Sequence, residues 1–247
     1  MERGTVRLGI LAVGLVGAVG VLAVATGFGG RMWKKVVGKA TVADRVQTFE
    51  GAVRGRIEDA FRAQGLAWGK GKIAFLCFKE ERVLEVYGRT SAEDSWRLVK
   101  SYPVLGQSGG LGPKRKEGDR QVPEGIYEVE SLNPNSRFHL SIRVNYPNAF
   151  DREQAEREGR TQLGGDIMIH GSDRSVGCLA MGDEAAEDLF VLVAIAETKR
   201  VPILISPRDL RKKAAPDSID GVPWAPELYR QLQQALAAFP HGDNEPR

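Results

Sequence analysis

The stretch IMIHGSDRSVGCLAMGD, from Ile167 to Asp183, joins a short apolar run to the start of a helical pattern. It places His170 and Cys178 eight residues apart, in a chain that has 3 histidines and 2 cysteines. A thiol becomes a good nucleophile when it loses its proton, and a neighbouring imidazole or helix N-terminus promotes that loss. Glycines at positions 171 and 177 permit sharp turns beside both side chains. The pattern indicates either a cysteine nucleophile with a histidine base or a core cysteine beside an ordinary histidine.

Short β-rich runs surround this stretch and are separated by turn residues, which is typical of an antiparallel meander. The sequence predicts strands at 72–79, 82–89, 96–105, 125–132, 138–146, 165–170 and 201–206. Between the third and fourth of these runs, residues 106–125 have the composition of a loop. The expected fold class is therefore mainly β with a few helices (α+β).

Three segments have helical patterns. Residues 42–66 carry apolar side chains at spacings of three and four, which predicts an amphipathic helix that is either a stalk or packed on the domain. Residues 183–199 begin with Asp183 as the expected N-cap and with acids in the first turn. Residues 226–239 begin with a proline, which favours the first turn of a helix.

The N-terminal segment Leu8–Phe28 has no charged residue. As a helix it is about 30 Å long, enough to cross a bilayer. It is either a signal peptide cleaved after Ala25 or an uncleaved anchor, and we favour the anchor because the run is long for a signal peptide. A buried helix of a soluble protein is the third reading. Basic residues on both sides leave its orientation open.

Net charge and motif spacing argue against several other functions. The net charge of +3, from 35 basic and 32 acidic residues, is too balanced to indicate binding of nucleic acid. The glycine-rich loop fails as a phosphate site because no Ser or Thr follows Lys114 and Pro113 lacks a backbone donor. The histidines show no metal-ligand spacing, so neither a metal nor another cofactor is expected. Cys77 lies in an apolar run and is predicted to be a buried structural thiol.

Beyond these patterns, IHGSDRSVGCLAM (169–181) resembles the catalytic signature of the L,D-transpeptidase (YkuD/ErfK) domain, particularly its YafK-like branch. The similarity extends over residues 70–211. It implies a YkuD-like β-sandwich catalytic domain, preceded by the membrane segment and the amphipathic helix. The expected organisation begins with an anchor or signal peptide at 1–30 and a linker with the amphipathic helix at 31–69. The catalytic domain follows at 70–211, and a C-terminal helical extension at 212–247.

The resemblance also implies roles for individual residues. Cys178 matches the nucleophile and His170 the general base, with the backbone carbonyl of Gly171 orienting the imidazole. Ser175 and Gly177 match the S-x-G-C element, whose backbone N–H groups, with that of Cys178, form the oxyanion hole.

Three further side chains are candidates for binding the carboxylates of the substrate implied by the resemblance, the peptide stem of peptidoglycan: Arg120, His139 and Arg174. The chain departs from many family members at Val176, where they carry a second histidine, and at Leu179 and Ala180, where they carry a polar or basic pair. Both departures bear on whether the chain carries out transpeptidation.

The reaction implied is acyl transfer through a Cys178 thioester on the tetrapeptide stem of peptidoglycan. An amine acceptor yields a 3–3 cross-link. Alternatively, a hydrolase or amidase of the same family trims stems or releases a wall-linked lipoprotein. An alternative of another class is a catalytically silent peptidoglycan-binding module. Since peptidoglycan lies outside the cytoplasmic membrane, the domain is expected to be periplasmic or extracytoplasmic, anchored by residues 8–28 or secreted. A cytoplasm-facing anchored protein is the weakest reading.

Overall fold

The computed structural model describes residues 39–198 and 200–240, and the described residues from Thr41 onward belong to one compact unit. The expected N-terminal anchor or signal peptide, residues 1–30, lies outside the described residues. Within the described ranges, none of the helices combines the length and the apolar character needed to cross a bilayer.

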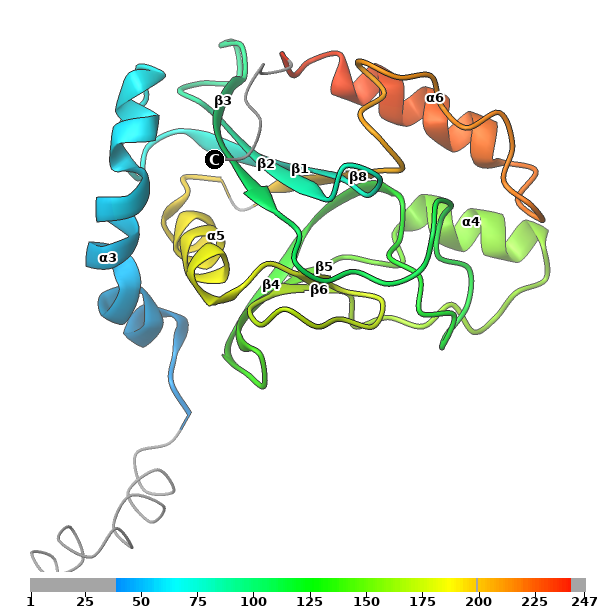
Figure 1. Cartoon of the computed structure of the whole chain (residues 1–247), viewed down its shortest axis with the longest axis horizontal. Coiled ribbons are helices and arrows are strands. Elements are labelled where there is room, and N and C mark those ends of the chain that lie inside the picture. Colours follow the sequence, from blue (N-terminus) through cyan, green and yellow to red (C-terminus); the bar gives the residue numbers. More distant parts are fainter. Residues whose placement is uncertain (1–38, 199, 241–247) are drawn as a thin grey trace, which may run out of the picture. The chain divides into compact units, whose positions relative to one another are not determined.

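Eight strands form the centre of this unit, in the spatial order β3-β2-β1-β8-β4-β5-β6-β7 (Figure 1). Their bounds are β1 Lys72–Phe78, β2 Val83–Arg89, β3 Arg97–Pro103, β4 Gly125–Ser136, β5 His139–Val144, β6 Met168–His170, β7 Leu179–Ala180 and β8 Pro202–Ser206. The antiparallel meander is confirmed for the first three strands. The last strand, β8, departs from it, because it lies between β1 and β4 and runs parallel to β1.

The long strand β4 links the two halves of the sheet. Its first residues, 125–128, pair with β8, and the rest of its 12 residues pair with β5. The register between β4 and β5 shifts between Val129 and Ser131, as at a β-bulge, and bulges bend strands. The eight strands therefore form one curled sheet in a mainly β unit, as the expected fold class requires, where the resemblance had implied a β-sandwich.

Side chains of β1 alternate between two hydrophobic cores because successive residues of a strand point to opposite faces. Phe75 and Cys77 enter one core, and Leu76 and Phe78 enter the other. Both faces of the central strands are therefore covered, and β1 is buried along almost its whole length.

Helices cover the two faces. Helix α3 (Val42–Ala63) lies beside α5 (Asp183–Ile195), and α6 (Ala225–Leu236) packs on the opposite core (Figure 1). Arg56 of α3 donates to Asp188 of α5 at 2.8 Å. The helix expected at 42–66 is therefore packed on the domain, which excludes the stalk.

Helix α4 (Ala149–Arg157) was not expected from the sequence. It is polar and short, so it lacks an apolar periodicity that could predict it. Its signal is a capping box, in which Asn148 and Asp151 each accept a hydrogen bond from the other's backbone N–H.

Candidate active site

The catalytic signature folds into two very short strands at one end of the sheet. Strands β6 and β7 run parallel, with Ile169 opposite Leu179 and His170 opposite Ala180. The same register brings Cys178, just before β7, beside Met168, whose backbone N lies 3.4 Å from the Cys178 Sγ. Met168 and His170 are two residues apart on one strand, so their side chains share a face. The register therefore brings the thiol and the imidazole to the same face of neighbouring strands.

The imidazole of His170 is held in one tautomer. Its Nδ1 lies 2.5 Å from the carbonyl oxygen of Gly171, and because a carbonyl only accepts, Nδ1 carries the proton. In the neutral ring Nε2 is then free to accept one. His170 is only 3% exposed, and the ring of Phe138 covers it at a centroid distance of 4.8 Å. Burial lowers the pKa of His170, and the hydrogen bond to Gly171 opposes that shift only in part.

The thiol of Cys178 is partly buried, and burial raises its pKa despite its contact with the backbone N–H of Met168. In the described part of the chain its Sγ makes no hydrogen bond to His170, and it donates to the carbonyl oxygen of Asp166 at 3.5 Å. Both shifts favour uncharged forms, so the resting pair is a neutral thiol and a neutral imidazole. The sequence had pointed instead to influences that promote the thiolate.

The helix N-terminus expected near the thiol is also arranged differently. Strand β7 separates Cys178 from α5, whose N-cap is Gly182 and not Asp183. The carboxylate of Asp183 instead accepts a hydrogen bond from the backbone N of Ser172 at 2.8 Å. Lack of space explains the glycine after the histidine, because a Cβ at Gly171 would lie 2.5 Å from the Asp183 Oδ1 and 2.8 Å from the backbone oxygen of Phe138.

Two backbone N–H groups expected in the oxyanion hole are occupied by serine hydroxyls. The N–H of Cys178 donates to Ser175 Oγ at 2.9 Å, and that of Gly177 donates to Ser108 Oγ at 2.7 Å. Gly177 has a φ of 84°, a conformation that favours glycine. Ser108 was missed because it lies in the glycine-rich loop, far from the signature in sequence, and a lone loop serine carries no signal of such a contact.

The three candidate carboxylate-binding residues have different surroundings. Arg120 and Arg174 are exposed, and neither side chain forms an ion pair within the described residues. Arg120 adjoins residues 171–178, the catalytic turn between β6 and β7. Its carbonyl oxygen accepts from Ser108 Oγ at 2.6 Å, and Ser108 in turn accepts from the N–H of Gly177. His139 is already engaged: its Nε2 lies 2.9 Å from Glu187 Oε1, and its ring packs edge-on against Phe49. We therefore keep the two arginines as candidates and assign His139 to the contact between the sheet and α5.

The described residues contain no cluster of three His, Cys, Asp or Glu side chains that could hold a metal ion.

A partly exposed cysteine and a buried histidine with its Nδ1 held by a carbonyl define a cysteine–histidine site at the edge of a mainly β domain. The sequence family described as the L,D-transpeptidase catalytic domain, YkuD, matches residues 78–205, and the chain belongs to this family.

Individual relatives resemble part of the chain. YafK of Escherichia coli (strain K12) is 40% identical over 118 residues, which cover 47% of this chain and 45% of the relative. The chain thus spans about half the length of the curated relatives it matches. The helical cell shape determining protein Pgp2 of Campylobacter jejuni is 23% identical, with a TM-score of 0.45, over 57% of this chain and 49% of the other. For Mycobacterium tuberculosis L,D-transpeptidase 1 the values are 14%, 0.32, 54% and 61%.

Proposed function

We propose that the protein is a peptidoglycan-modifying cysteine enzyme that transfers an acyl group from a tetrapeptide stem through a thioester on Cys178. The observation that carries this proposal is the placement of Cys178 and His170 on one face of β6 and β7, with Gly171 holding the imidazole in the tautomer of a base. Membership of the L,D-transpeptidase family supports the substrate class.

In the first step the Sγ of Cys178 attacks the carbonyl carbon of the diamino-acid residue while Nε2 of His170 accepts the thiol proton. The C–N bond to the terminal D-alanine then breaks, and the amine leaves with the proton from His170. In the second step an amine of another stem attacks the thioester, gives its proton to His170 and forms the 3–3 cross-link. The proton returns to the Cys178 sulfur, so the enzyme is restored.

The neutral resting pair suits this sequence. A histidine with a lowered pKa stays unprotonated at neutral pH and is ready to accept a proton. A thiol with a raised pKa keeps its proton until the substrate carbonyl arrives, so proton transfer and attack take place together. General base catalysis of this kind contributes about 10²–10⁴-fold to the rate.

The developing oxyanion needs the N–H groups of Gly177 and Cys178. In the resting structure Ser108 and Ser175 occupy them with neutral hydroxyls. A charged oxygen accepts roughly twice as strongly as a neutral one. Exchange of the hydroxyls for the oxyanion is therefore favourable in the transition state, when the charge is greatest.

Arg120 and Arg174 are proposed to bind the carboxylates of the stem. Both are exposed beside the catalytic turn, and a guanidinium matches a carboxylate with two parallel hydrogen bonds. Each is therefore available to a ligand without the loss of an existing ion pair.

Two alternative functions remain to be distinguished from transpeptidation. Water as acceptor makes the enzyme a hydrolase that trims stems or releases a wall-linked lipoprotein. A silent peptidoglycan-binding module is favoured by the occupied oxyanion donors and by Val176, which is 71% exposed where many family members carry a histidine.

We also propose that the protein acts outside the cytoplasmic membrane, where its substrate lies. The uncharged segment 8–28 supports either an anchor in that membrane or secretion after cleavage.

The test is mass spectrometry of the products formed by the full-length protein and by Cys178→Ala, with disaccharide-tetrapeptides and with protein-bearing sacculi. Cysteine-dependent 3–3 dimers are expected. Cysteine-dependent tripeptides or released protein without dimers would make the protein a hydrolase. If wild type and Cys178→Ala give the same products while both are folded and bind sacculi, the enzyme proposal is wrong and the binding module takes its place.

A further inference from the structure

A hollow lies along the loop of residues 106–124, the active-site loop, whose Ser108 hydroxyl accepts a hydrogen bond from the backbone N–H of Gly177. It is a cavity of about 400 Å³ between residues 111–121, Arg160 and residues 219–222. None of the residues from His170 to Cys178 lines it. Its size is within the range of small-ligand sites. The cavity is therefore separate from the thiol and the imidazole, although it shares a loop with them.

One wall of the cavity carries an excess of positive charge. The carboxylate of Glu158 accepts from two guanidinium groups, those of Arg115 at 3.1 Å and Arg160 at 2.6 Å. Trp224 donates its indole N–H to the same carboxylate at 3.0 Å. One negative charge is thus shared by two positive ones, and neither arginine side chain is more than one-third exposed. The shared carboxylate leaves one net positive charge in a wall that is partly screened from water.

The other charges around the cavity do not cancel this excess. Asp119 is neutralised by the Lys114 ammonium at 2.6 Å and accepts three backbone N–H groups as well. Lys116 is exposed, and its ammonium has no ion pair within the described residues. Among the described residues that line the cavity, Asp220 is the exposed carboxylate that opposes an anionic ligand. An arginine pair and a free lysine therefore face one free aspartate.

Apolar side chains complete the lining. Leu111 and Pro113 come from the loop, and Ile219 and Val222 come from the C-terminal segment. A ligand that fits this lining combines an anionic group with an apolar part. Guanidinium groups match carboxylates in shape as well as in charge. A peptide with a free carboxylate has both features, whereas inorganic phosphate lacks the apolar part.

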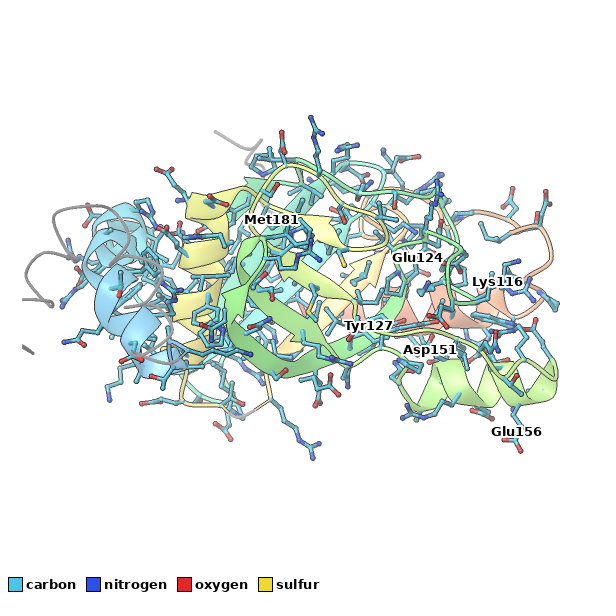
Figure 2. The ribbon with its side chains drawn as sticks, turned by 90° about the horizontal axis from the view of Figure 1, so that it is seen from below. Lys116, Glu124, Tyr127, Asp151, Glu156 and Met181 are labelled. Atoms are coloured by element: carbon cyan, nitrogen blue, oxygen red, sulfur yellow. The ribbon has the colours of Figure 1, made fainter. Side chains whose placement is uncertain are left out.

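The cavity lies between the active-site loop and a segment near the C-terminus. The segment 219–222 lies beyond the residues 78–205 that match the family. Gln121 lines the cavity, and its backbone oxygen is 3.7 Å from the position that a Cβ on Gly177 would occupy. The same loop thus contacts the cavity on one side and the catalytic turn on the other. Figure 2 shows Lys116 at the end of the molecule that carries α4 and α6.

We propose that this cavity is a second ligand site, which binds a carboxylate group of a peptide between the active-site loop and the C-terminal segment. The site rests on the proposed function only for the choice of peptide, a peptidoglycan stem. The C-terminal segment then has a role in binding, since it supplies the wall opposite the loop.

The test uses two NMR reporters in ¹⁵N-labelled full-length Cys178→Ala protein, titrated with a disaccharide-tetrapeptide. The indole N–H of Trp224, assigned with Trp224→Phe, reports on the cavity because it is bonded to Glu158. The backbone N–H of Gly177 reports on the catalytic turn. Both signals are expected to shift and saturate, with separate apparent affinities.

Variants separate the two sites. Arg160→Gln and Lys116→Met are each expected to weaken the affinity reported by Trp224 roughly tenfold, as for loss of a charge-assisted hydrogen bond. Asp220→Asn is expected to strengthen it. Arg200→Gln is the matched control, because this side chain is 82% exposed and lies outside the cavity. Lys116→Met keeps the test valid if Arg160→Gln fails to fold.

The outcomes are distinct for the two proposals. A Trp224 signal that does not respond, or that responds equally in Lys116→Met and the parent, overturns the second site even if Gly177 responds. Equal affinity for acetate, for inorganic phosphate or for a stem with amidated carboxylates also overturns it, because the peptide carboxylate is then not what is bound. A response at Trp224 without one at Gly177 supports the second site and counts against the proposed active site.

Discussion

Two cysteines in one sheet have opposite surroundings. Cys77 lies in β1, in the middle of the strand order, where its side chain is 0% exposed and burial raises its pKa to about 12. Cys178 lies just before β7, the outermost strand of that order, and is partly accessible next to His170. The comparison teaches that position in the sheet decides what a thiol does. A central strand buries the thiol completely, whereas the sheet edge leaves it partly accessible on the same face as an imidazole.

The largest expected effect comes from removing each thiol in turn. We expect Cys178→Ala to lower product formation by at least about 10³-fold, because the covalent intermediate cannot form. Cys77→Ala should keep activity within a few-fold and cost about 1–2 kcal/mol of unfolding free energy through the lost packing. Product mass spectrometry and urea unfolding measure the two effects. Activity that depends equally on both thiols would break the comparison.

Next in size is the effect of the base. His170→Ala should slow the reaction by about 10²–10⁴-fold, the usual contribution of a general base. The matched control is His139→Ala, since His139 is bound to Glu187 and does not touch the thiol. Alkylation of Cys178 by a substrate-like electrophile, followed over time, measures the change. A control as slow as His170→Ala would show that the loss reflects distortion of the sheet edge.

A substitution beside the buried central strands should lower the stability of the protein but leave the reactivity of Cys178 unchanged. Tyr229 of α6 donates to Glu124 at 2.8 Å, and the same buried carboxylate pairs with Lys79 at 2.9 Å. Tyr229→Phe leaves that carboxylate with one donor fewer, so we expect a loss of about 1–3 kcal/mol. Thermal and urea unfolding measure it. The rate constant for Cys178 alkylation should stay unchanged, and a parallel loss of reactivity would contradict this separation.

The smallest expected effect concerns the pH dependence. Because the pKa of His170 is lowered, its imidazole stays neutral below pH 6.5, and activity is lost only as the pH falls through the lowered value. Phe138→Ala exposes the ring, so the acidic limb of the kcat/KM profile should move up toward pH 6.5. At a fixed acidic pH the variant should therefore lose more activity than the parent, because a larger share of its imidazole is protonated. An unchanged limb would show that Phe138 does not control burial of the imidazole.

Local sequence alone determined much of this protein. Alternation and turn residues predicted seven of the eight strands, and apolar spacing, acids in a first turn and an N-terminal proline predicted three of the four described helices. The histidine and cysteine of the candidate site were visible because the residue types and the glycines beside them carry a local signal. These features depend on neighbours within a few positions, which is the range over which periodicity operates.

Only the tertiary structure decided which distant segments meet. It inserted β8 between β1 and β4, brought Ser108 to the N–H of Gly177 and tied His139 to Glu187. It also formed the open basic cavity between the loop and residues 219–222. The physical reason is that strand pairing and side-chain contact join residues separated by many positions, and no local pattern records which partner a strand or a charged group will find.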